Sequence, residues 1–542
     1  MAIATSSYRP YYLEIRGELK LCEASPLHVG AGEEWSLVTD APVLRDPADH
    51  RPYIPGSSLR GVLRGFLERE SRLLVGGWKG VFDSLFGHAP GKGESEGHSF
   101  LGRLTVFDAC CDPKDQGGSE VRDHVKVEPE TGAAADQGKF DAEAIFDASF
   151  ALRLIYEGGD DGDQEIVLLR AALRALEDGE LRVGAKGGWG YGKLVLSHGW
   201  EWRSFRRNDP SELAKYLKRR LEPGSKDEGE WKIASGFPSP AAAQPAAAAR
   251  GGDDDLAPRS ILEFELRIQC EGPVLVKSPV PPEILAKDEL DRLEGQTKSD
   301  ANRWWEVGRH VADHVPLVSA AVHVQPYLPG SSLRGVLRSQ AMRICRSQAA
   351  ETSPGERDWL WKRLFGTAKG GSKGVEDRKG CIEVGDGRLH GDPQYVYLDH
   401  VAIDRITNFA ADRKKFSACA LESPAFDLTV RLVLERGQKA CAALFAFLLR
   451  DLGERGKLWL GSGTTRGYGM VASSQILSFR ANLVKADWPA APGGAEENGR
   501  VRFSLPEDSE AQSNGILRSD LGWLWKALDG AWGAACEREG GA

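Results

Sequence analysis

The decapeptide PGSSLRGVLR occurs twice in this sequence, at residues 55–64 and again at residues 329–338, with all ten residues identical. Such an identity does not recur by chance in a chain of this composition. Self-similarity at a constant offset indicates a repeated structural unit. The rest of the sequence therefore needs to be searched for further landmarks at the same spacing.

Further landmarks recur in the same order. The offset between the copies is 274 residues for the decapeptide, 279 for the Leu-Phe-Gly at 85–87, 278 between Asp108 and Asp386, 276 for the Asp-His-Val at 123–125, and 277 for the Gly-Tyr-Gly at 190–192. Because all the offsets agree within a few residues, the sequence predicts two copies of one domain in tandem.

The composition indicates a soluble chain of more than one domain. It has 542 residues, 41% of them hydrophobic and 27% charged, with a net charge of −9. This charge argues against a generally basic nucleic-acid binder but allows a basic groove on one face. The sequence has no apolar run of about 18 residues for a membrane span, no signal peptide, and nine cysteines without CxxC spacing. We expect a cytoplasmic protein with reduced thiols and no membrane contact.

The positions of the two copies divide the chain into four predicted segments. These are a first domain at 1–205, a linker at 206–260 with an Ala/Pro/Gly-rich stretch at 237–258, a second domain at 261–482, and a tail at 483–542. PLHVG at 26–30 matches PVLVK at 273–277 with an offset of only 247, so the second copy carries an insertion of 27 residues (274 − 247), near 279–312. The linker composition favours a flexible chain.

The tail contains an amphipathic segment. Apolar residues fall at helical spacing, and Asp520 precedes them as a candidate N-cap. Its apolar face either closes a core or docks a partner. The apolar positions are Leu521, Leu524, Trp525, Leu528 and Trp532.

The order of elements predicts an α+β fold. Alternating polar and apolar residues predict strands at 12–24 and 261–272, and further strands at 103–109, 144–157 and 193–202. An apolar stripe from Leu59 to Leu67 makes the repeated peptide the start of a helix, and 165–179 predicts a second helix. The order strand–helix–strand–strand–helix–strand is typical of a ferredoxin-like domain.

The repeated peptide also combines several anion-binding groups. Helix N-terminal amides, serine hydroxyls and two arginines four residues apart present donors to a phosphate. The alternative is an ordinary capped helix with solvated arginines. The candidate phosphate-binding residues are Ser57, Ser58, Arg60 and Arg64 in the first copy and Ser331, Ser332, Arg334 and Arg338 in the second.

Two glycine-rich loops follow, GAKGGWGYGK at 184–193 and GSGTTRGYGM at 461–470. They are not nucleotide-binding P-loops, because Leu194 stands where Ser or Thr should bind Mg²⁺ and a strand follows instead of a helix. Glycine permits close approach to a nucleic-acid backbone, whereas the alternative is a tight structural turn. The candidate RNA contacts in these loops are Gly190, Gly192, Arg466, Gly467 and Gly469.

Long hairpins are predicted at 122–146 and 398–422, and Lys126 of the first is a further candidate RNA contact. A two-stranded hairpin with few core residues must pack against something outside its own domain. A plain surface hairpin is the alternative. If the hairpins bind RNA, residues near 127–135 and 403–411 should lie against it.

Together these motifs identify a family resemblance. LHVGAGEE, TDAPVLRDP, PYIPGSSLRG, LFG, DHVKVEPETGAA and GWGYG follow one another in the first copy. In that order they resemble the RAMP superfamily, specifically the backbone subunits of type III CRISPR effector complexes. The resemblance covers about residues 12–200 and 262–480, as a fused tandem of two such domains.

The resemblance implies function and partners. Each domain would be a ferredoxin-like, RRM-like fold that holds CRISPR guide RNA without reading its sequence, while base pairing selects the target RNA. The hairpins would act as thumbs that displace one nucleotide of the duplex at regular intervals. Other type III effector subunits would be partners, and the chain would be a metal-dependent target-RNA endoribonuclease.

The family's cleaving aspartate matches Asp40 in the TDAPV stretch. A displaced nucleotide can align its 2′-OH with the adjacent phosphorus, but a free aspartate, with a pKa of about 3.9, is a weak base at neutral pH. We therefore expect Asp40 to orient the hydroxyl or to hold a divalent ion, Mg²⁺ or Mn²⁺. The alternative is an Asx turn before Pro42.

The second copy departs from this pattern. Asp313 lies three residues before Pro316, whereas Asp40 lies two before Pro42, and Leu275 and Lys277 replace His28 and Gly30. Asp313 is either a second catalytic residue or part of a dead site.

Two other functions stay open: a non-catalytic RNA-binding scaffold, and a nuclease that processes precursor guide RNA by histidine acid–base catalysis. The candidate histidines for the second function are His28, His124 and His400. Structural zinc is a lesser possibility, because the spacing of the candidate ligands fits no standard zinc motif. Those ligands are His88, His98, Cys110, Cys111 and His124.

Overall fold

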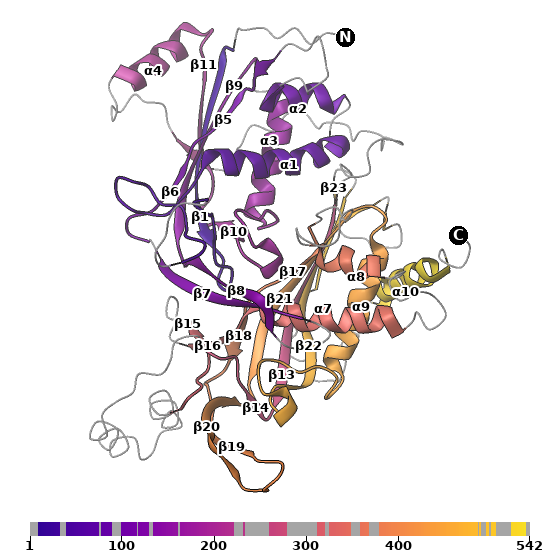
Figure 1. Ribbon diagram of the computed structural model, residues 1–542. Helices are drawn as coiled ribbons and strands as arrows, with labels where there is room; N and C mark the ends of the chain where they lie inside the picture. Colours follow the sequence, from indigo (N-terminus) through magenta and orange to yellow (C-terminus); the bar gives the residue numbers. More distant parts are fainter. Residues whose placement is uncertain are drawn as a thin grey trace.

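The computed structural model describes residues 9–32, 39–74, 77–88, 99–115, 117–128, 134–160, 163–221, 231–233, 259–278, 312–319, 325–347, 358–367, 379–485, 487–488, 495–497, 500–505 and 522–537. Two domains follow one another, each an antiparallel sheet with helices on one face (Figure 1).

The first domain is built on β1 (Tyr11–Leu21), which pairs on one side with β9 (Ser149–Gly158) and on the other with β10 (Leu194–Leu196) and β11 (Glu201–Arg206). Beyond β9 lie β5 (Leu104–Val106) and β6 (Ala109–Cys111), and β2 (Tyr53–Ile54) pairs with β6. The helices are α1 (Gly56–Leu74), α2 (Trp78–Phe86) and α3 (Gln164–Glu177). A small sheet joins β3 (Gly87–His88) to β4 (Phe100–Leu101).

The second domain repeats this arrangement around β13 (Ser260–Glu271), which lies between β21 (Ala425–Leu434) and β22 (Met470–Val484). Beyond β21 lie β17 (Ile382–Val384) and β18 (Gly387–His390), then β16 (Gln325–Leu328) and β15 (Val318–Ser319). Its helices are α7 (Gly330–Ser347), α8 (Asp358–Phe365) and α9 (Lys439–Gly453). The edge carries β24 (Arg500–Leu505) and β23 (Ala495–Glu497).

The prediction of two tandem ferredoxin-like domains is confirmed. β1 lies between β9 and β11 in the first sheet, and β13 lies between β21 and β22 in the second. In the strand–helix–strand–strand–helix–strand pattern, the first of the four strands likewise lies between the third and the fourth. Alternation along β1 sends Leu13 and Ile15 into the helical layer, where the α1 residues Leu59, Leu63 and Leu67 are also buried. The apolar stripe of the repeated peptide therefore forms part of each core.

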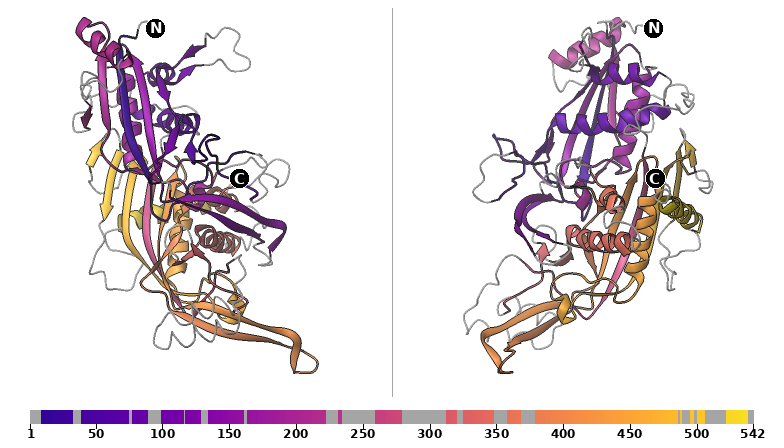
Figure 2. Two further views of the ribbon diagram at one scale, coloured as in Figure 1. Left: turned by 90° about the vertical axis from the view of Figure 1, so that its left-hand side faces the viewer. Right: turned by 45° about the vertical axis from the view of Figure 1, so that its right-hand side comes forward.

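Both predicted hairpins are present and project to the same side of the molecule (Figure 2). The first joins β7 (Gly118–Val127) to β8 (Ala134–Phe146), and the second joins β19 (Tyr395–Ile403) to β20 (Ala410–Glu422), with β14 (Pro273–Val274) pairing to β20. Of the first hairpin's turn, residues 129–133 lie outside the described residues.

The predicted linker limits are partly wrong. Residues 206–260 include α4 (Pro210–Leu221), whose Tyr216 packs against Tyr12 and Phe205 of the first sheet, and β12 (Lys232–Ile233), which pairs with β11. These three aromatic side chains are buried together between α4 and the sheet, so α4 belongs to the first domain. The predicted insertion falls almost wholly outside the described residues.

The tail helix α10 (Gly522–Glu537) packs against α9, with Leu524 and Leu528 buried in the second core. The core-closing alternative is therefore the one that the structure supports; Asp520 and Leu521 lie outside the described residues. Among the helices that the structure describes, none is long and apolar enough to cross a membrane.

The glycine loops are tight turns at matching places. Gly192 and Gly469 both have positive φ, and their amides donate to the carbonyls of Pro26 and Pro273, respectively. A Cβ on Gly192 would lie 1.9 Å from the Val183 carbonyl oxygen, and one on Gly469 would lie 1.8 Å from that of Leu460. These two glycines are thus required by the turn itself, so any RNA contact they make is an additional role that stays a prediction.

We predict that Gly192→Ala destabilises the first domain by about 3 kcal/mol, because alanine adds backbone strain and a steric clash. Gly61→Ala is the matched control: Gly61 lies inside α1 with nothing within 4 Å of its Cβ position, and alanine should stabilise the helix by about 0.5–1 kcal/mol. Denaturant titration of both variants measures the difference. Equal stability of the two variants would contradict this account of the loop.

Candidate functional site

Asp40 is fixed to the first hairpin by a reciprocal pair of hydrogen bonds. Its backbone N–H donates to Asp141 Oδ1 at 2.7 Å, and the Asp141 N–H donates to Asp40 Oδ2 at 3.0 Å. Thr39 Oγ1 also donates to Asp141 Oδ1, at 2.6 Å, and this bond lowers the pKa of Asp141. The Asp40 side chain itself lies exposed beside the hairpin.

Asp313 occupies the equivalent place in the second domain. Ser417 N–H donates to Asp313 Oδ2 at 2.7 Å, and the Asp313 N–H lies 3.2 Å from Ser417 Oγ. Ser417 stands opposite Asp399 in its hairpin, as Asp141 stands opposite Asp123 in the first. Although the spacing to the following proline differs by one residue, the hairpin therefore holds both aspartates at one position of the fold.

The segment that carries Asp40 is bonded to β8 through Ala41, whose carbonyl oxygen accepts the Glu143 N–H at 3.0 Å, and through side chains. Val43 N–H donates to Glu143 Oε2 at 2.9 Å, and Arg45 forms an ion pair with the same carboxylate. His28 is buried beneath it, with Nδ1 2.7 Å from the Glu143 carbonyl oxygen. These contacts fix the backbone of the loop and leave the Asp40 carboxylate at its edge.

The first site also holds a lysine that the sequence analysis did not identify. Lys186 Nζ lies 5.3 Å from the ring centroid of Phe140 and 5.1 Å from that of Trp189, and burial lowers its pKa to about 8. Lys186 has a φ of 61°, a left-handed conformation that costs a non-glycine residue about 1 kcal/mol. The second domain has Gly463 at this position, so comparing the copies gave no signal for Lys186.

The second site has cations from other positions. Arg466 lies 4.9 Å from the Phe416 ring centroid, and Lys277 pairs in a bridge with Pro316, three residues after Asp313. His400 Nε2 lies 2.6 Å from the Tyr468 hydroxyl. Of the predicted residues, Arg466 thus lies near Asp313, and Gly467 lies exposed next to it.

The histidines of the first site are poor acids at neutral pH. His124 stacks on Phe140 and lies 4.6 Å from the Trp189 ring, and burial lowers its pKa to about 4. Burial also lowers the pKa of His28. Both side chains are therefore neutral near pH 7, which weakens the alternative of histidine acid–base catalysis at this site.

The arginines of the repeated peptide have a structural partner in each domain. Arg60 donates to the carbonyl of Phe86, the last residue of α2, and Arg334 donates to the equivalent carbonyl of Phe365 in α8. Arg64 and Arg338 lie over Phe82 and Trp361 at 5.6 and 5.1 Å. Satisfying a helix C-terminus gives Arg60 and Arg334 the same structural role without RNA, so the phosphate contacts stay a prediction.

The serines differ in exposure: Ser57 is exposed, whereas Ser58, Ser331 and Ser332 are half-buried. Arg334 is enclosed further, because a Cβ on Gly188 of the first domain would lie 3.5 Å from its Nε, and burial lowers its pKa to about 10. Arg60 is therefore more accessible than Arg334, its equivalent in the second domain.

The hairpins expose Lys126 and several apolar side chains. Apolar surface on an extended hairpin that its own domain leaves uncovered suits contact with nucleotide bases. The most exposed apolar residues of the hairpins are Val121, Val125, Val127, Phe140, Val401, Ile403, Ile406 and Phe409, at 37–93% relative exposure.

Asp40 and Asp141 bring two carboxylates together at the first site, and hard divalent cations prefer such oxygen ligands. The second site has Asp313 with the hydroxyl of Ser417 instead. In the part of the chain that the structure describes, no three His, Cys, Asp or Glu side chains gather as a metal-binding cluster. The zinc candidates include His98, which lies outside the described residues.

Known proteins match both domains. The family model of the RAMP superfamily matches residues 22–195 and 268–472. Proteins named "CRISPR system Cms endoribonuclease Csm3" are similar: that of Streptococcus thermophilus is 30% identical over 186 residues, 31% of this chain and 81% of the relative. Those of Methanothermobacter thermautotrophicus and Mycobacterium tuberculosis are 28% and 27% identical, covering 34% and 36% of this chain and 83% and 89% of the relatives.

Each aligned relative thus corresponds to about one domain of this chain. The two family matches together span more than half of the chain, and they coincide with the two sheets and their hairpins. This chain therefore belongs to the RAMP superfamily, as a tandem of two such domains.

Proposed function

We propose that this chain is a guide-RNA-binding backbone subunit of a type III CRISPR effector complex and cleaves base-paired target RNA at two sites, near Asp40 and Asp313. Guide RNA, target RNA and other effector subunits are its partners. The free state of all eight described cysteines supports a cytoplasmic complex. The similarity to proteins named endoribonucleases supports RNA cleavage as the activity.

One observation carries the proposal: Asp40 and Asp313 are bound at the same hairpin position in the two domains. An aspartate that only capped a turn would not need to be hydrogen-bonded to the same position of the hairpin in both domains. A hairpin that displaces a nucleotide would present the neighbouring phosphodiester to the carboxylate beside it. Two copies then supply two equivalent cleavage sites.

The chemistry requires little from the protein beyond alignment. The 2′-oxygen attacks the adjacent phosphorus, the bond from phosphorus to the 5′-oxygen breaks, the 2′-hydroxyl loses its proton and the 5′-oxygen gains one. The products are a 2′,3′-cyclic phosphate and a 5′-hydroxyl. Asp40 would orient the 2′-hydroxyl by accepting its hydrogen bond, so its contribution is positional.

Lys186 would supply the positive charge at the first site. Its ammonium group lies beside Asp141 and the rings of Phe140 and Trp189, where it can stabilise charge that develops on the phosphate. The left-handed backbone at Lys186 supports a functional role, since glycine would relieve the strain there. Arg466 and Lys277 would serve the second site.

A divalent ion fits the first site in part, because Asp40 and Asp141 offer two carboxylates and RNA phosphate oxygens can complete the coordination. When bound, Mg²⁺ or Mn²⁺ would neutralise charge on the phosphate. Asp313 would hold the ion at the second site with fewer protein charges.

A non-catalytic scaffold is the second candidate. Its support is that the Asp40 carboxylate satisfies a hairpin amide, the N–H of Asp141, and so also has a structural use. Cleavage assays separate the two functions.

We predict that Asp40→Ala removes one cut in the target while the affinity for guide RNA stays unchanged, because the carboxylate contributes nothing to phosphate binding. Asp313→Ala should remove the neighbouring cut. Asp46→Ala, in the same loop as Asp40, is the control and should keep both cuts. A sequencing gel of end-labelled target, cleaved by the assembled complex, measures this. Two intact cuts in both variants would leave the scaffold function.

Lys186→Gly should slow the first cut at least tenfold and leave the second unchanged, while the free energy of unfolding stays equal or rises by about 1 kcal/mol. Because a lysine is charged below its pKa, the first cut of the unchanged protein should fall as pH rises through about 8 or somewhat higher. The second cut should fall less, because the second site has Gly463 at the position of Lys186. A parallel loss of both cuts would exclude this role for Lys186.

Replacing Asp141 by the serine of the second copy should raise the Mg²⁺ concentration needed for the first cut, because one carboxylate is lost. EDTA should reduce both cuts. Titrating Mg²⁺ into the EDTA-treated complex and quantifying each cut measures the shift; a Mg²⁺ requirement unchanged by Asp141→Ser would remove Asp141 from the ion site.

A further inference from the structure

The two domains are joined by a heterologous contact, in which each contributes a different surface. Arg122 at the base of the first hairpin is buried and forms an ion pair with Asp386 at 2.6 Å, and it lies 4.5 Å from the Tyr327 ring centroid. The other carboxylate oxygen of Asp386 accepts the Gly330 N–H, at the start of α7. An arginine from one domain thus fills a socket at the repeated peptide of the next.

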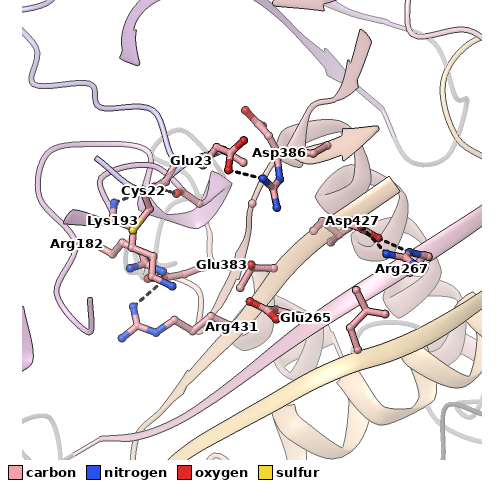
Figure 3. Close-up of a pocket in the computed structure, with 18 of the residues that line it drawn as sticks. Cys22, Glu23, Arg182, Lys193, Glu265, Arg267, Glu383, Asp386, Asp427 and Arg431 are labelled. Carbon is pink, nitrogen blue, oxygen red and sulfur yellow. Dashed lines mark hydrogen bonds and ion pairs between the residues drawn. The ribbon is translucent and has the colours of Figure 1, made fainter. Parts of the chain in front are cut away.

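Other polar contacts surround this socket. Arg182 forms an ion pair with Glu383 at 3.1 Å, and Lys193 donates to Glu263 at 3.2 Å. Figure 3 shows Arg182 and Lys193 of the first domain and Glu383 of the second around a shared cavity of about 680 Å³. Gly190 of the first glycine loop packs against Gly385, because a Cβ there would lie 2.4 Å from the Gly385 Cα. Most of these partners are buried, so their identity determines which surfaces can pair.

The first domain carries the same socket, and none of the residues that the structure describes fills it as Arg122 fills that of the second domain. Asp108 Oδ1 accepts the Gly56 N–H at 2.7 Å, as Asp386 accepts that of Gly330, and Tyr53 stands in the place of Tyr327. Asp108 is exposed, whereas Asp386 is 5% exposed beneath Arg122. A heterologous contact leaves one unused copy of each surface at the ends of the pair.

The unused surface of the second domain does not match this socket. Leu398 stands where Arg122 does, opposite Ala418 as Arg122 is opposite Ala142, and Trp459 stands where Arg182 does. The receiving face differs as well, with Thr105 in place of Glu383 and Phe107 in place of Gly385. A second copy of this chain would therefore form neither ion pair.

The receiving face is also partly covered. Glu14, the counterpart of Glu263, already pairs with Arg203 and Arg153 at 3.0 and 2.8 Å, and Arg219 of α4 lies within 3.5 Å of it. The ring of Trp231 lies over Arg203 at 4.3 Å. No carboxylate equivalent to Glu263 is left to bind a lysine. Asp108 is an exposed charge of that face, and Arg153, whose side chain is 40% exposed, lies 4.6 Å from the Phe107 ring beside it.

We propose that the Asp108 socket of the first domain receives the hairpin of a separate RAMP subunit with a basic side chain where this chain has Arg122, and that a second copy of this chain is excluded. An exposed carboxylate at a helix start complements a guanidinium, and the missing partners on the second domain act against self-pairing. The inference concerns assembly, so it can fail while the proposed cleavage holds, and the reverse.

Sedimentation of the purified full chain tests the exclusion. The unchanged chain should show no self-association through this face. A chain with Thr105→Glu, Phe107→Gly, Leu398→Arg and Trp459→Arg restores both ion pairs and the close approach. It should self-associate at least tenfold more tightly, and adding Asp108→Asn should reverse the gain. Self-association of the unchanged chain that Asp108→Asn abolishes would overturn the proposal.

The assembled complex tests the occupant without depending on those substitutions. Native mass spectrometry of a tagged full chain, co-expressed with guide RNA and the other effector subunits, should show one RAMP subunit retained next to the first domain. Asp108→Asn keeps an oxygen for the Gly56 N–H and should weaken retention of that subunit at least tenfold; Glu201→Gln, an exposed residue on β11, is the control. Unchanged retention with Asp108→Asn, or a second copy of this chain at that end, would refute the proposal.

Discussion

The buried ion pair between Arg122 and Asp386 sets the relation between the two halves of this molecule. It fixes the base of the first hairpin to the start of α7 in the second domain. Burying two charges is favourable only when their geometry and remaining hydrogen bonds are satisfied. Here the helix N-terminus supplies the second donor to Asp386. The separation between Asp40 and Asp313 follows from this contact.

Much of the fold could be predicted from the sequence because the two copies of the domain can be compared with each other. Landmarks at nearly constant offset gave the duplication, and the stripe of Leu59, Leu63 and Leu67 gave the core helix. The resemblance gave Asp40. Local composition led to the wrong assignment of α4 to the linker. Its Tyr216 packs against Tyr12 and Phe205, about 200 and 11 positions earlier, and no sequence pattern indicates these contacts.

The site was harder to predict, because its contacts also join residues that are far apart in the sequence. Asp141 and Ser417 share an offset of 276 with the Asp-His-Val landmarks, so aligning the hairpins could have shown that Asp313 is not displaced. Comparing the copies could not identify Lys186, because the second copy has glycine at that position. Arg60 was assigned to phosphate because it lies near a helix start beside two serines and a second arginine, in a peptide that is identical in both copies. Its partner is a carbonyl of the next helix, 26 residues on, which spacing does not reveal.

The proposed function requires two equivalent cleavage sites at a fixed separation on one chain. The most direct measurement maps both cuts of the unchanged protein at nucleotide resolution, on targets paired to guides of shifted register. The account predicts two cuts that move together with the guide and keep one constant spacing. A single cut, or a spacing that varies with the target sequence, would contradict it.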